Sequence, residues 1–372
     1  MPESGGGAIL CEKPLSLGLS CFHRYHKTGT TGSDSFASHP LHHDILIGSP
    51  EVLMFDAVLK HLLSLSISLA TLFVPHEKWQ REMENQPTRA QRIAAKDLRR
   101  WTFETVVSKY TGQIHSFYRY PCTDTASRKT LLLLHGFNTD GSIFFNLNPL
   151  AATHTLIAYN FPESTDLYTG SIRDFELLID DFLSCMNLDT VDLLGNSLGG
   201  IIAQFYAAHT DHCAIRNLVL VSTYVPGATK ANIRQIRNMA DKMLPYPDYK
   251  LFYLLTLGNR IAKRLEKKEV KPEDSPLGTV VIKQIPWYRQ VLTSMYWFDG
   301  TKETKNITCP VLALHGKKDR LVPVSEVAQM EKYLPQTEVT LFDGTGHTLI
   351  FDEADRAIRE ISRKLQSDNR KN

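Results

Sequence analysis

Short apolar runs that alternate with segments of helical spacing constrain the fold of this 372-residue chain more than any other feature. Four of the runs are TLLLLHG (130–136), TLIAYNF (155–161), TVDLLG (190–195) and RNLVLVS (216–222). Each has the length of one strand and little polar alternation, which is typical of a parallel sheet covered on both faces. Helical spacing between the runs, as in 171–186, then predicts an α/β fold with a mostly parallel central sheet flanked by helices.

A long insertion interrupts this rhythm before its last two strands. Residues 223–308 contain no convincing buried strand, and their helical segments are separated by turns with Pro and Gly. Strands resume with PVLALHG at 310–316 and TEVTLFDG at 337–344. An insertion of this length between core strands is usually functional. We therefore expect a core at 103–222 and 309–372, with 223–308 inserted between core strands as a helical cap.

The first hundred residues fall outside the rhythm. Residues 1–50 are rich in Gly, Ser, Thr and His without a sustained period, which predicts a disordered tail. Residues 51–102 predict a helical extension, in which 52–74 is strongly apolar. The uncharged part of that segment is shorter than the roughly 20 residues of a spanning helix. Segment 52–74 fits either packing on the main domain or peripheral contact with a membrane surface. Met54 is an alternative to Met1 as the start of the chain.

Composition limits the partners of the chain. Lys and Arg number 42 against 40 Asp and Glu, a net charge of +2, which argues against a nucleic-acid binder. The six cysteines form no C-x-x-C pair and the N-terminus lacks a signal-peptide pattern, so we expect a cytoplasmic protein, either with or without membrane association. A metal site at His39, His42 and His43 is the alternative to a polar segment, but no ligand frame surrounds them. We expect no metal and no cofactor.

The strongest local motif is Gly195-Asn196-Ser197-Leu198-Gly199, which lies between a predicted strand and a predicted helix. A strand that turns sharply into a helix strains its central residue, and small neighbours let the two backbones pass. Such a turn presents the Ser197 hydroxyl at the carboxyl edge of the sheet and at a helix N-terminus, which favours negative charge. Ser197 is therefore the predicted nucleophile.

A serine hydroxyl needs a base that is held by an acid. His347 lies in a glycine-bearing loop after the last predicted strand, and Asp319 follows the strand before it, so we predict these two as base and acid. The competing residues are His209, His212 and His315, which we interpret as surface or structural, and Asp343 and Asp352, which flank the His347 loop. Asp343 is disfavoured because it belongs to the histidine's own strand.

Acyl transfer also needs donors for the oxyanion of the tetrahedral intermediate. The Leu198 amide is one predicted donor, because it follows the nucleophile directly. The second is the amide of Phe137, in a loop after an earlier central strand where Gly136 allows the turn. Taken alone, His135-Gly136 would be an ordinary turn at a strand end.

Together these motifs resemble the α/β-hydrolase superfamily from about residue 103 to 372. The resemblance rests on His135-Gly136-Phe137, Gly195 to Gly200, HGKKDRLVP around Asp319 and GTGHTLIFDEAD around His347, in that order. An apolar segment before HGF and a helical cap look like monoacylglycerol-lipase-type members. The GNSLGG elbow is also similar to C–C bond hydrolases of aromatic degradation, but Asn138-Thr139-Asp140 replaces their Gly-Pro-Gly. A serine at 197 argues against members with an aspartate nucleophile.

The resemblance implies a serine hydrolase, an esterase or lipase that acts through Ser197, His347 and Asp319 and an acyl-enzyme. The expected partner is a small-molecule ester of apolar character, and aromatic residues of the cap could line an acyl pocket. A C–C bond or thioester hydrolase with the same three residues is the alternative, and a non-catalytic binding protein with a hydrolase fold is a further one. One more departure concerns the loop after the fourth strand, where Asn160-Phe161-Pro162-Glu163-Ser164 replaces D-x-x-G-x-G.

Overall fold

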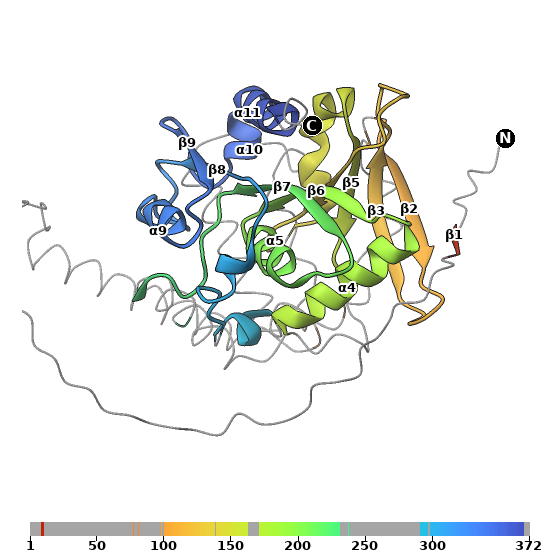
Figure 1. Cartoon of the computed structure of the whole chain (residues 1–372), viewed down its shortest axis with the longest axis horizontal. Helices are drawn as coiled ribbons and strands as arrows, with labels where there is room; N and C mark the ends of the chain where they lie inside the picture. Colours follow the sequence, from red (N-terminus) through yellow and green to blue (C-terminus); the bar gives the residue numbers. More distant parts are fainter. Residues whose placement is uncertain are drawn as a thin grey trace, which may run out of the picture. The chain divides into compact units, whose positions relative to one another are not determined.

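Nine strands form one twisted sheet in the computed structural model, in the order β1-β2-β3-β5-β4-β6-β7-β8-β9 (Figure 1). The structure describes residues 9–10, 77, 81, 98, 100–137, 139–162, 171–230, 237, 291–296 and 298–367. The strands are β1 (Ile9–Leu10), β2 (Thr102–Val107), β3 (Ile114–Tyr120), β4 (Thr130–Leu134), β5 (Thr155–Asn160), β6 (Thr190–Asn196), β7 (Ala214–Val221), β8 (Val311–Gly316) and β9 (Thr337–Phe342).

The sheet is parallel from β5 to β9, and only β3 runs antiparallel to both of its neighbours. Each parallel strand ends at the same edge, where its carboxyl end meets a loop. The prediction of a mostly parallel sheet flanked by helices is therefore confirmed.

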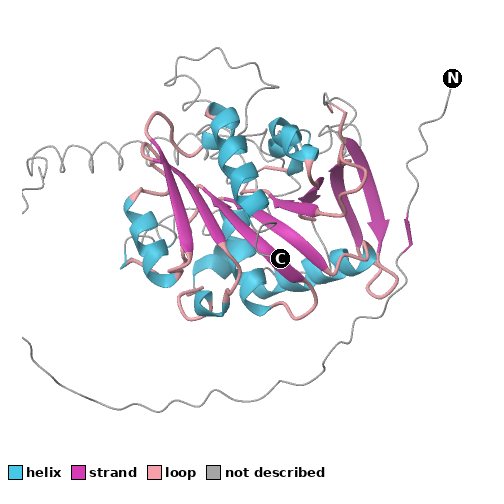
Figure 2. Ribbon diagram, turned by 45° about the horizontal axis from the view of Figure 1, so that its top comes forward, coloured by secondary structure: helices cyan, strands magenta, loops and turns pink. Residues whose placement is uncertain are grey.

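Helices cover both faces of this sheet (Figure 2). They are η1 (Gly141–Ala152), α4 (Ile172–Cys185), α5 (Leu198–His209), α9 (Ser325–Tyr333), α10 (Leu349–Asp352), α11 (Ala354–Ser367) and the short η4 (Thr304–Asn306). Helix α4 begins at a capping box, in which Ser171 Oγ accepts from the Arg173 amide at 3.1 Å and Asp174 Oδ2 accepts from the Ser171 amide at 3.0 Å.

The central strand β4 has core on both sides. All five of its residues are buried, and Leu132 and Leu134 belong to the cluster with α4 and α5. Leu131 and Leu133 belong to the opposite cluster, with η1 and α11. Burial of one leucine side chain stabilises a fold by about 2 kcal/mol, so β4 holds the sheet between its helical layers.

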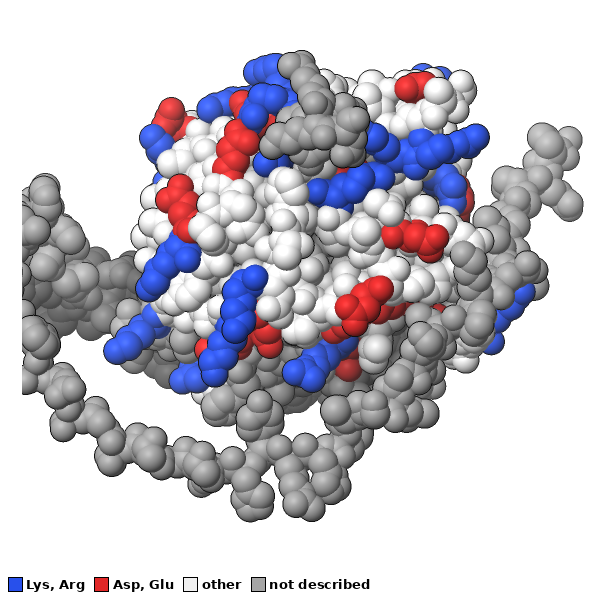
Figure 3. Space-filling model, in the orientation of Figure 1, with Lys and Arg blue, Asp and Glu red and all other residues white. Residues whose placement is uncertain are grey.

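Charged side chains of both signs are interspersed on the face of the molecule in Figure 3. No single-sign field covers that part of the described surface. This distribution agrees with the net charge of +2.

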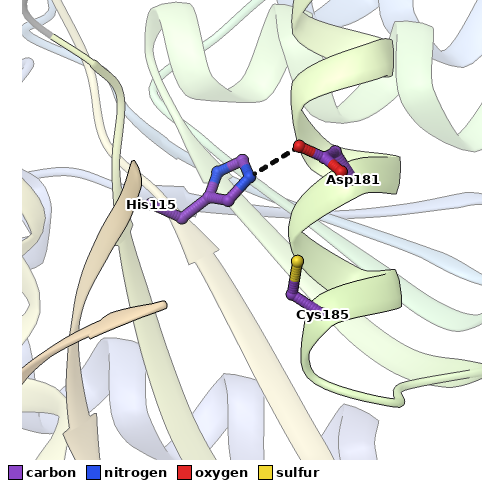
Figure 4. A group of neighbouring side chains, drawn as sticks. All are labelled: His115, Asp181 and Cys185. Carbon is purple, nitrogen blue, oxygen red and sulfur yellow. Dashed lines mark hydrogen bonds and ion pairs between the residues drawn. The ribbon is translucent and has the colours of Figure 1, made fainter. Parts of the chain in front are cut away.

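A buried polar network fastens the antiparallel strands to α4. His115 on β3 places Nε2 3.0 Å from Asp181 Oδ2 on α4 (Figure 4). Its Nδ1 lies 2.9 Å from the Tyr159 hydroxyl. Asp181 also accepts from Ser108 Oγ and Thr111 Oγ1, both at 2.7 Å. Sequence reasoning missed this network, because His115 and Asp181 belong to no motif and lie 66 positions apart.

Cys185 lies one helical turn beyond Asp181, and its Sγ completes a group of three potential metal ligands with His115 (Figure 4). Their ligand atoms all lie within 4.8 Å of one another. The histidine and the carboxylate already bond to each other and to neighbouring hydroxyls, so both are satisfied without an ion. We interpret the group as a structural link.

The predicted N-terminal segments lie mostly outside the described residues. Of 1–50, the structure describes only Ile9 and Leu10, which pair with Val106 and Val107 of β2. Segment 52–74 is not described. No described helix is long and apolar enough to cross a membrane.

The body of the predicted cap, 231–236 and 238–290, also lies outside the described residues. The two ends of the insertion are described and meet each other, because the Gly300 amide donates to the Pro226 carbonyl at 3.0 Å. The insertion thus leaves and re-enters the core at one place, between β7 and β8.

Candidate active site

Ser197 occupies a strained turn between β6 and α5. Its φ of 53° and ψ of −116° lie in a region that non-glycine residues rarely adopt. Gly195 and Gly199 flank it without side chains for a steric reason. A Cβ on Gly195 would lie 2.3 Å from the Gly199 carbonyl oxygen, and one on Gly199 would lie 2.1 Å from the Leu134 oxygen. Glycine at these two positions therefore lets the start of α5 pack closely against the ends of β6 and β4.

Hydrogen bonds from β7 hold this turn in place. The Ser197 amide donates to the Val221 carbonyl at 2.8 Å. Thr223 Oγ1 donates to the Ser197 carbonyl, also at 2.8 Å. Strain of this kind costs on the order of 1–3 kcal/mol and persists only where surrounding contacts fix it.

The structure brings Ser197, His347 and Asp319 together. His347 Nε2 lies 3.0 Å from Ser197 Oγ, and its Nδ1 lies 2.8 Å from Asp319 Oδ2. Because a carboxylate only accepts, Nδ1 donates to Asp319 and Nε2 is left to accept from the serine hydroxyl. These are the tautomer and the orientation in which a histidine acts as a base toward a serine.

Asp319 is a fully buried carboxylate, with a side-chain exposure of 0%. Its Oδ1 accepts from the amides of Leu321 and Val322, both at 2.8 Å. Burial raises the pKa of Asp319, but the hydrogen bond and charge of His347 and the Val322 amide outweigh it, so this pKa lies below its usual range. Asp319 is thus ionised near neutral pH.

The loop of the predicted oxyanion donor lies directly above the serine. A Cβ on Gly136 would lie 3.2 Å from Ser197 Cβ, a tight contact, so glycine gives this loop the most room beside the serine. The Phe161 amide donates to His135 Nε2 at 3.2 Å, which leaves Nδ1 to donate to the Gly136 carbonyl at 2.9 Å. His135 therefore braces the loop that carries the Phe137 amide.

The sequence pattern of the alpha/beta hydrolase family matches residues 131–361. The chain belongs to the alpha/beta hydrolase family. The match begins in β4 and ends in α11, so it covers every residue of the Ser197, His347 and Asp319 group.

Similar proteins include enzymes that act on esters. The chain is 25% identical over 259 residues to the pimeloyl-[acyl-carrier protein] methyl ester esterase of Aliivibrio salmonicida. The match covers 64% of this chain and 93% of that protein. It is 19% identical over 246 residues to the monoacylglycerol lipase ABHD6 of Bos taurus, covering 60% and 72%.

A solved structure shares the fold of this alpha/beta hydrolase. The esterase EaEST from Exiguobacterium antarcticum superposes with a TM-score of 0.57 at 18% identity, and the match covers 72% of this chain and 99% of that one. The family match and the relatives above make the protein a hydrolase with esterase-like and lipase-like relatives.

In this alpha/beta hydrolase the competing acids have other partners. Asp343 is exposed and pairs with Lys317 Nζ at 2.6 Å. Asp352 Oδ2 accepts from Thr345 Oγ1 at 3.0 Å and Thr348 Oγ1 at 2.6 Å, so it braces the loop on both sides of His347. Asp319, in contrast, bonds to His347 Nδ1 at 2.8 Å.

The competing histidines also have structural contacts in this hydrolase. His315 Nε2 donates to the Val322 carbonyl at 2.9 Å and so holds the Asp319 loop, and burial lowers its pKa. His209 bonds to the Phe205 carbonyl on α5, and His212 bonds to Ser184 Oγ on α4.

Several supporting residues had no sequence signal of their own. Thr223 follows β7 without a motif, and its role depends on one distance to Ser197. Asn160, the last residue of β5, accepts from the Gly141 amide at 2.8 Å through Oδ1 and so joins the start of η1 to the sheet. Asn138 and Glu163 lie outside the described residues.

Proposed function

We propose that this protein is a serine hydrolase that cleaves carboxylic esters. The observation that carries the proposal is the continuous hydrogen-bonded series from Ser197 Oγ through His347 to Asp319, at 3.0 and 2.8 Å. It begins at a strained serine on a helix N-terminus and ends at a buried, ionised carboxylate. A serine alone is a weak nucleophile at neutral pH, and this series supplies the base that activates it.

The proposed reaction proceeds in two halves. Ser197 Oγ attacks the ester carbonyl carbon while His347 Nε2 takes the hydroxyl proton, and His347 then gives that proton to the leaving alcohol. Water next attacks the acyl-enzyme, with His347 taking its proton and returning it to Ser197 as the acid leaves.

Two groups stabilise the charges that develop. The buried Asp319 carboxylate orients the imidazole and stabilises its charged form. The amides of Phe137 and Leu198 are proposed to donate to the oxyanion, because both adjoin the nucleophile in the chain or in space. One such donor contributes about 3–4 kcal/mol to transition-state stabilisation.

The proposed substrate is a small, uncharged or apolar ester. The printed names of two relatives, an esterase for a methyl ester and a monoacylglycerol lipase, support this class. The near-zero net charge also suits an uncharged substrate better than a polyanion.

We further propose that residues 223–308 act as a cap that selects among esters, and that the protein is cytoplasmic. Cys122, Cys213 and Cys309 are free thiols, which supports a reducing compartment.

Labelling with a fluorophosphonate tests the nucleophile. We expect the intact mass of the wild type to rise by one adduct, and no adduct on Ser197→Ala. Ser222→Ala is the matched control, because Ser222 is a buried serine at the end of the neighbouring strand, and it should label like the wild type. An unlabelled wild type would contradict the serine-hydrolase proposal.

A substrate panel then tests the ester class. Turnover of p-nitrophenyl esters should rise from acetate to medium acyl chains. Turnover of a thioester alone, or of acetate alone, would favour the alternatives over an apolar ester.

A further inference from the structure

The loop between β8 and α9 has an unusual surface for a loop beside a reaction centre. We call residues 317–324 the acid loop, because it carries Asp319. Among the described residues, the exposed large apolar side chains are Tyr110, Ile114, Leu177, Leu321 and Val324. Two of these five lie in the acid loop, where Leu321 is 57% and Val324 37% exposed.

Three cations belong to the same loop as these apolar side chains. Lys317, Lys318 and Arg320 are all exposed. The loop's own acid, Asp319, is turned inward with 0% side-chain exposure and adds no negative charge to the surface. Asp343 neutralises only Lys317, through an exposed ion pair. The acid loop is therefore a cationic surface with an aliphatic centre.

The nearest carboxylate on α9 also faces inward. Glu326 is buried, and its Oε1 accepts from Thr229 Oγ1 at 2.8 Å. Glu326 therefore adds no negative charge to the exposed side of the acid loop. Surfaces of mixed aliphatic and cationic character suit the boundary between anionic headgroups and acyl chains.

The acid loop is joined directly to the reaction centre. The Leu321 and Val322 amides hold Asp319 Oδ1, and Asp319 Oδ2 holds His347. The acid loop is therefore connected by hydrogen bonds, through Asp319 and His347, to the Ser197 hydroxyl, to which His347 bonds at 3.0 Å.

We propose that the acid loop docks on an anionic lipid surface, with Leu321 and Val324 entering the headgroup layer and Lys318 and Arg320 facing anionic headgroups. Docking there would present membrane esters to Ser197. That consequence rests on the proposed function, whereas the docking itself does not. The contact differs from the one suggested for 52–74, since it lies on the core.

Vesicle flotation of the full chain tests the docking. The protein carries Ser197→Ala in every arm, so no lipid is hydrolysed. We expect it to float with phosphatidylcholine vesicles that contain phosphatidylglycerol, to stay behind with phosphatidylcholine alone, and to be released by salt. Near-UV circular dichroism checks that each variant is folded.

Two independent variant pairs address the two halves of the surface. We expect each pair to lower the partition coefficient by about tenfold or more. The first pair is Lys318→Glu with Arg320→Glu, since each cation near an anionic surface contributes about 1 kcal/mol. The second is Leu321→Glu with Val324→Glu, which replaces the aliphatic side chains that enter the headgroup layer. The control for the cations is Lys302→Glu with Lys305→Glu, at exposed positions elsewhere. The control for the apolar pair is Leu177→Glu, at 59% exposure on α4. Both should float unchanged.

Three results would overturn the proposal: no flotation of the parent protein, flotation that ignores anionic lipid, or acid-loop variants that float like their controls. The last result would move the contact to another segment, such as 52–74. Because catalysis is disabled throughout, failure here leaves the fluorophosphonate test unaffected, and failure of labelling leaves the flotation result intact.

Discussion

At the scale of single residues, the site depends on one backbone conformation and two hydrogen bonds. Ser197 is held at a φ of 53° although it is not glycine, because its side chain is needed and its neighbours at 195 and 199 supply the space. His347 then reaches it across the sheet edge from a loop 150 positions away. The chemistry therefore requires that the strands from β6 to β9 be paired first.

Replacement of Asp319 by asparagine separates positioning from charge. In Asp319→Asn the amide can still bond to His347, but it favours the wrong tautomer and leaves the imidazolium without its counter-charge. We expect kcat for a p-nitrophenyl ester to fall on the order of a thousandfold or more, with a small change in KM. Steady-state kinetics measure this.

Asp343→Asn is the control for that replacement. Asp343 is exposed and contacts Lys317 rather than His347, so its removal should leave kcat unchanged. An equal loss in both variants would show that the acid had been assigned wrongly.

The three residues of the proposed reaction could be found from sequence because each follows a strand. In a parallel sheet all carboxyl ends meet at one edge, so residues after β6, β8 and β9 must come close. The roles of His135 and Thr223 could not be found in this way. Each depends on a single short distance that no pattern of residue types encodes.

At the scale of elements, buried parallel strands were the easiest to predict. Each reads as a continuous apolar run, as β4 does with all five residues buried. The elements that were missed include β1, within the predicted disordered tail, and the longer β2 and η1. β2 is a half-buried strand that contains Glu104, and η1 is an apolar 3₁₀ helix with Pro149 inside and no amphipathic period. Neither has a repeat that separates it from a loop.

Asp181 shows how one element is fixed to another, and its contribution depends on pH. Burial raises its pKa, but hydrogen bonds from His115, Ser108 and Thr111 outweigh this, so the folded-state pKa is lowered. A lowered carboxyl pKa stabilises the fold at every pH above the pKa of the unfolded state, about 3.9. This stabilisation is lost as the pH falls through the pKa of the folded state.

Asp181→Ala should therefore lower the free energy of unfolding at neutral pH by about 3 kcal/mol, since it leaves a buried histidine without its partner. The difference between variant and wild type should shrink as the pH falls below about 4. Urea unfolding at several pH values measures it. Asp189→Ala, at an exposed position after α4, should change stability little, and a pH-independent loss in Asp181→Ala would contradict the carboxylate's role.

At the scale of the whole molecule, only part of the N-terminal region forms a unit of its own. Met1–Leu15 and His76–Asn372 belong to one unit of the chain, and Ser16–Pro75 form a second. The core already includes Trp101, which stacks on Phe145 with ring centroids 5.2 Å apart. Composition alone could not place this boundary, because it depends on which residues pack together.

A chain that begins at His76 should therefore fold and turn over a soluble ester with the kcat of the full chain, because β2 to β9 and every residue of the Ser197 site are retained. Thermal unfolding and kinetics on p-nitrophenyl esters measure this. A chain that begins at Ile114 is the control. It lacks Trp101, β2 and the Ser108 and Thr111 bonds to Asp181, so it should unfold at a lower temperature.

Loss of activity in the chain that begins at His76, with its fold intact, would show that the first 75 residues serve the reaction itself. Retained activity on soluble esters with reduced flotation would instead assign them to membrane contact. The acid loop would still be present in that chain, so any flotation that remains must come from the core. The comparison thus separates the contact suggested for 52–74 from the surface around Leu321, and it does so without changing a residue of the reaction centre.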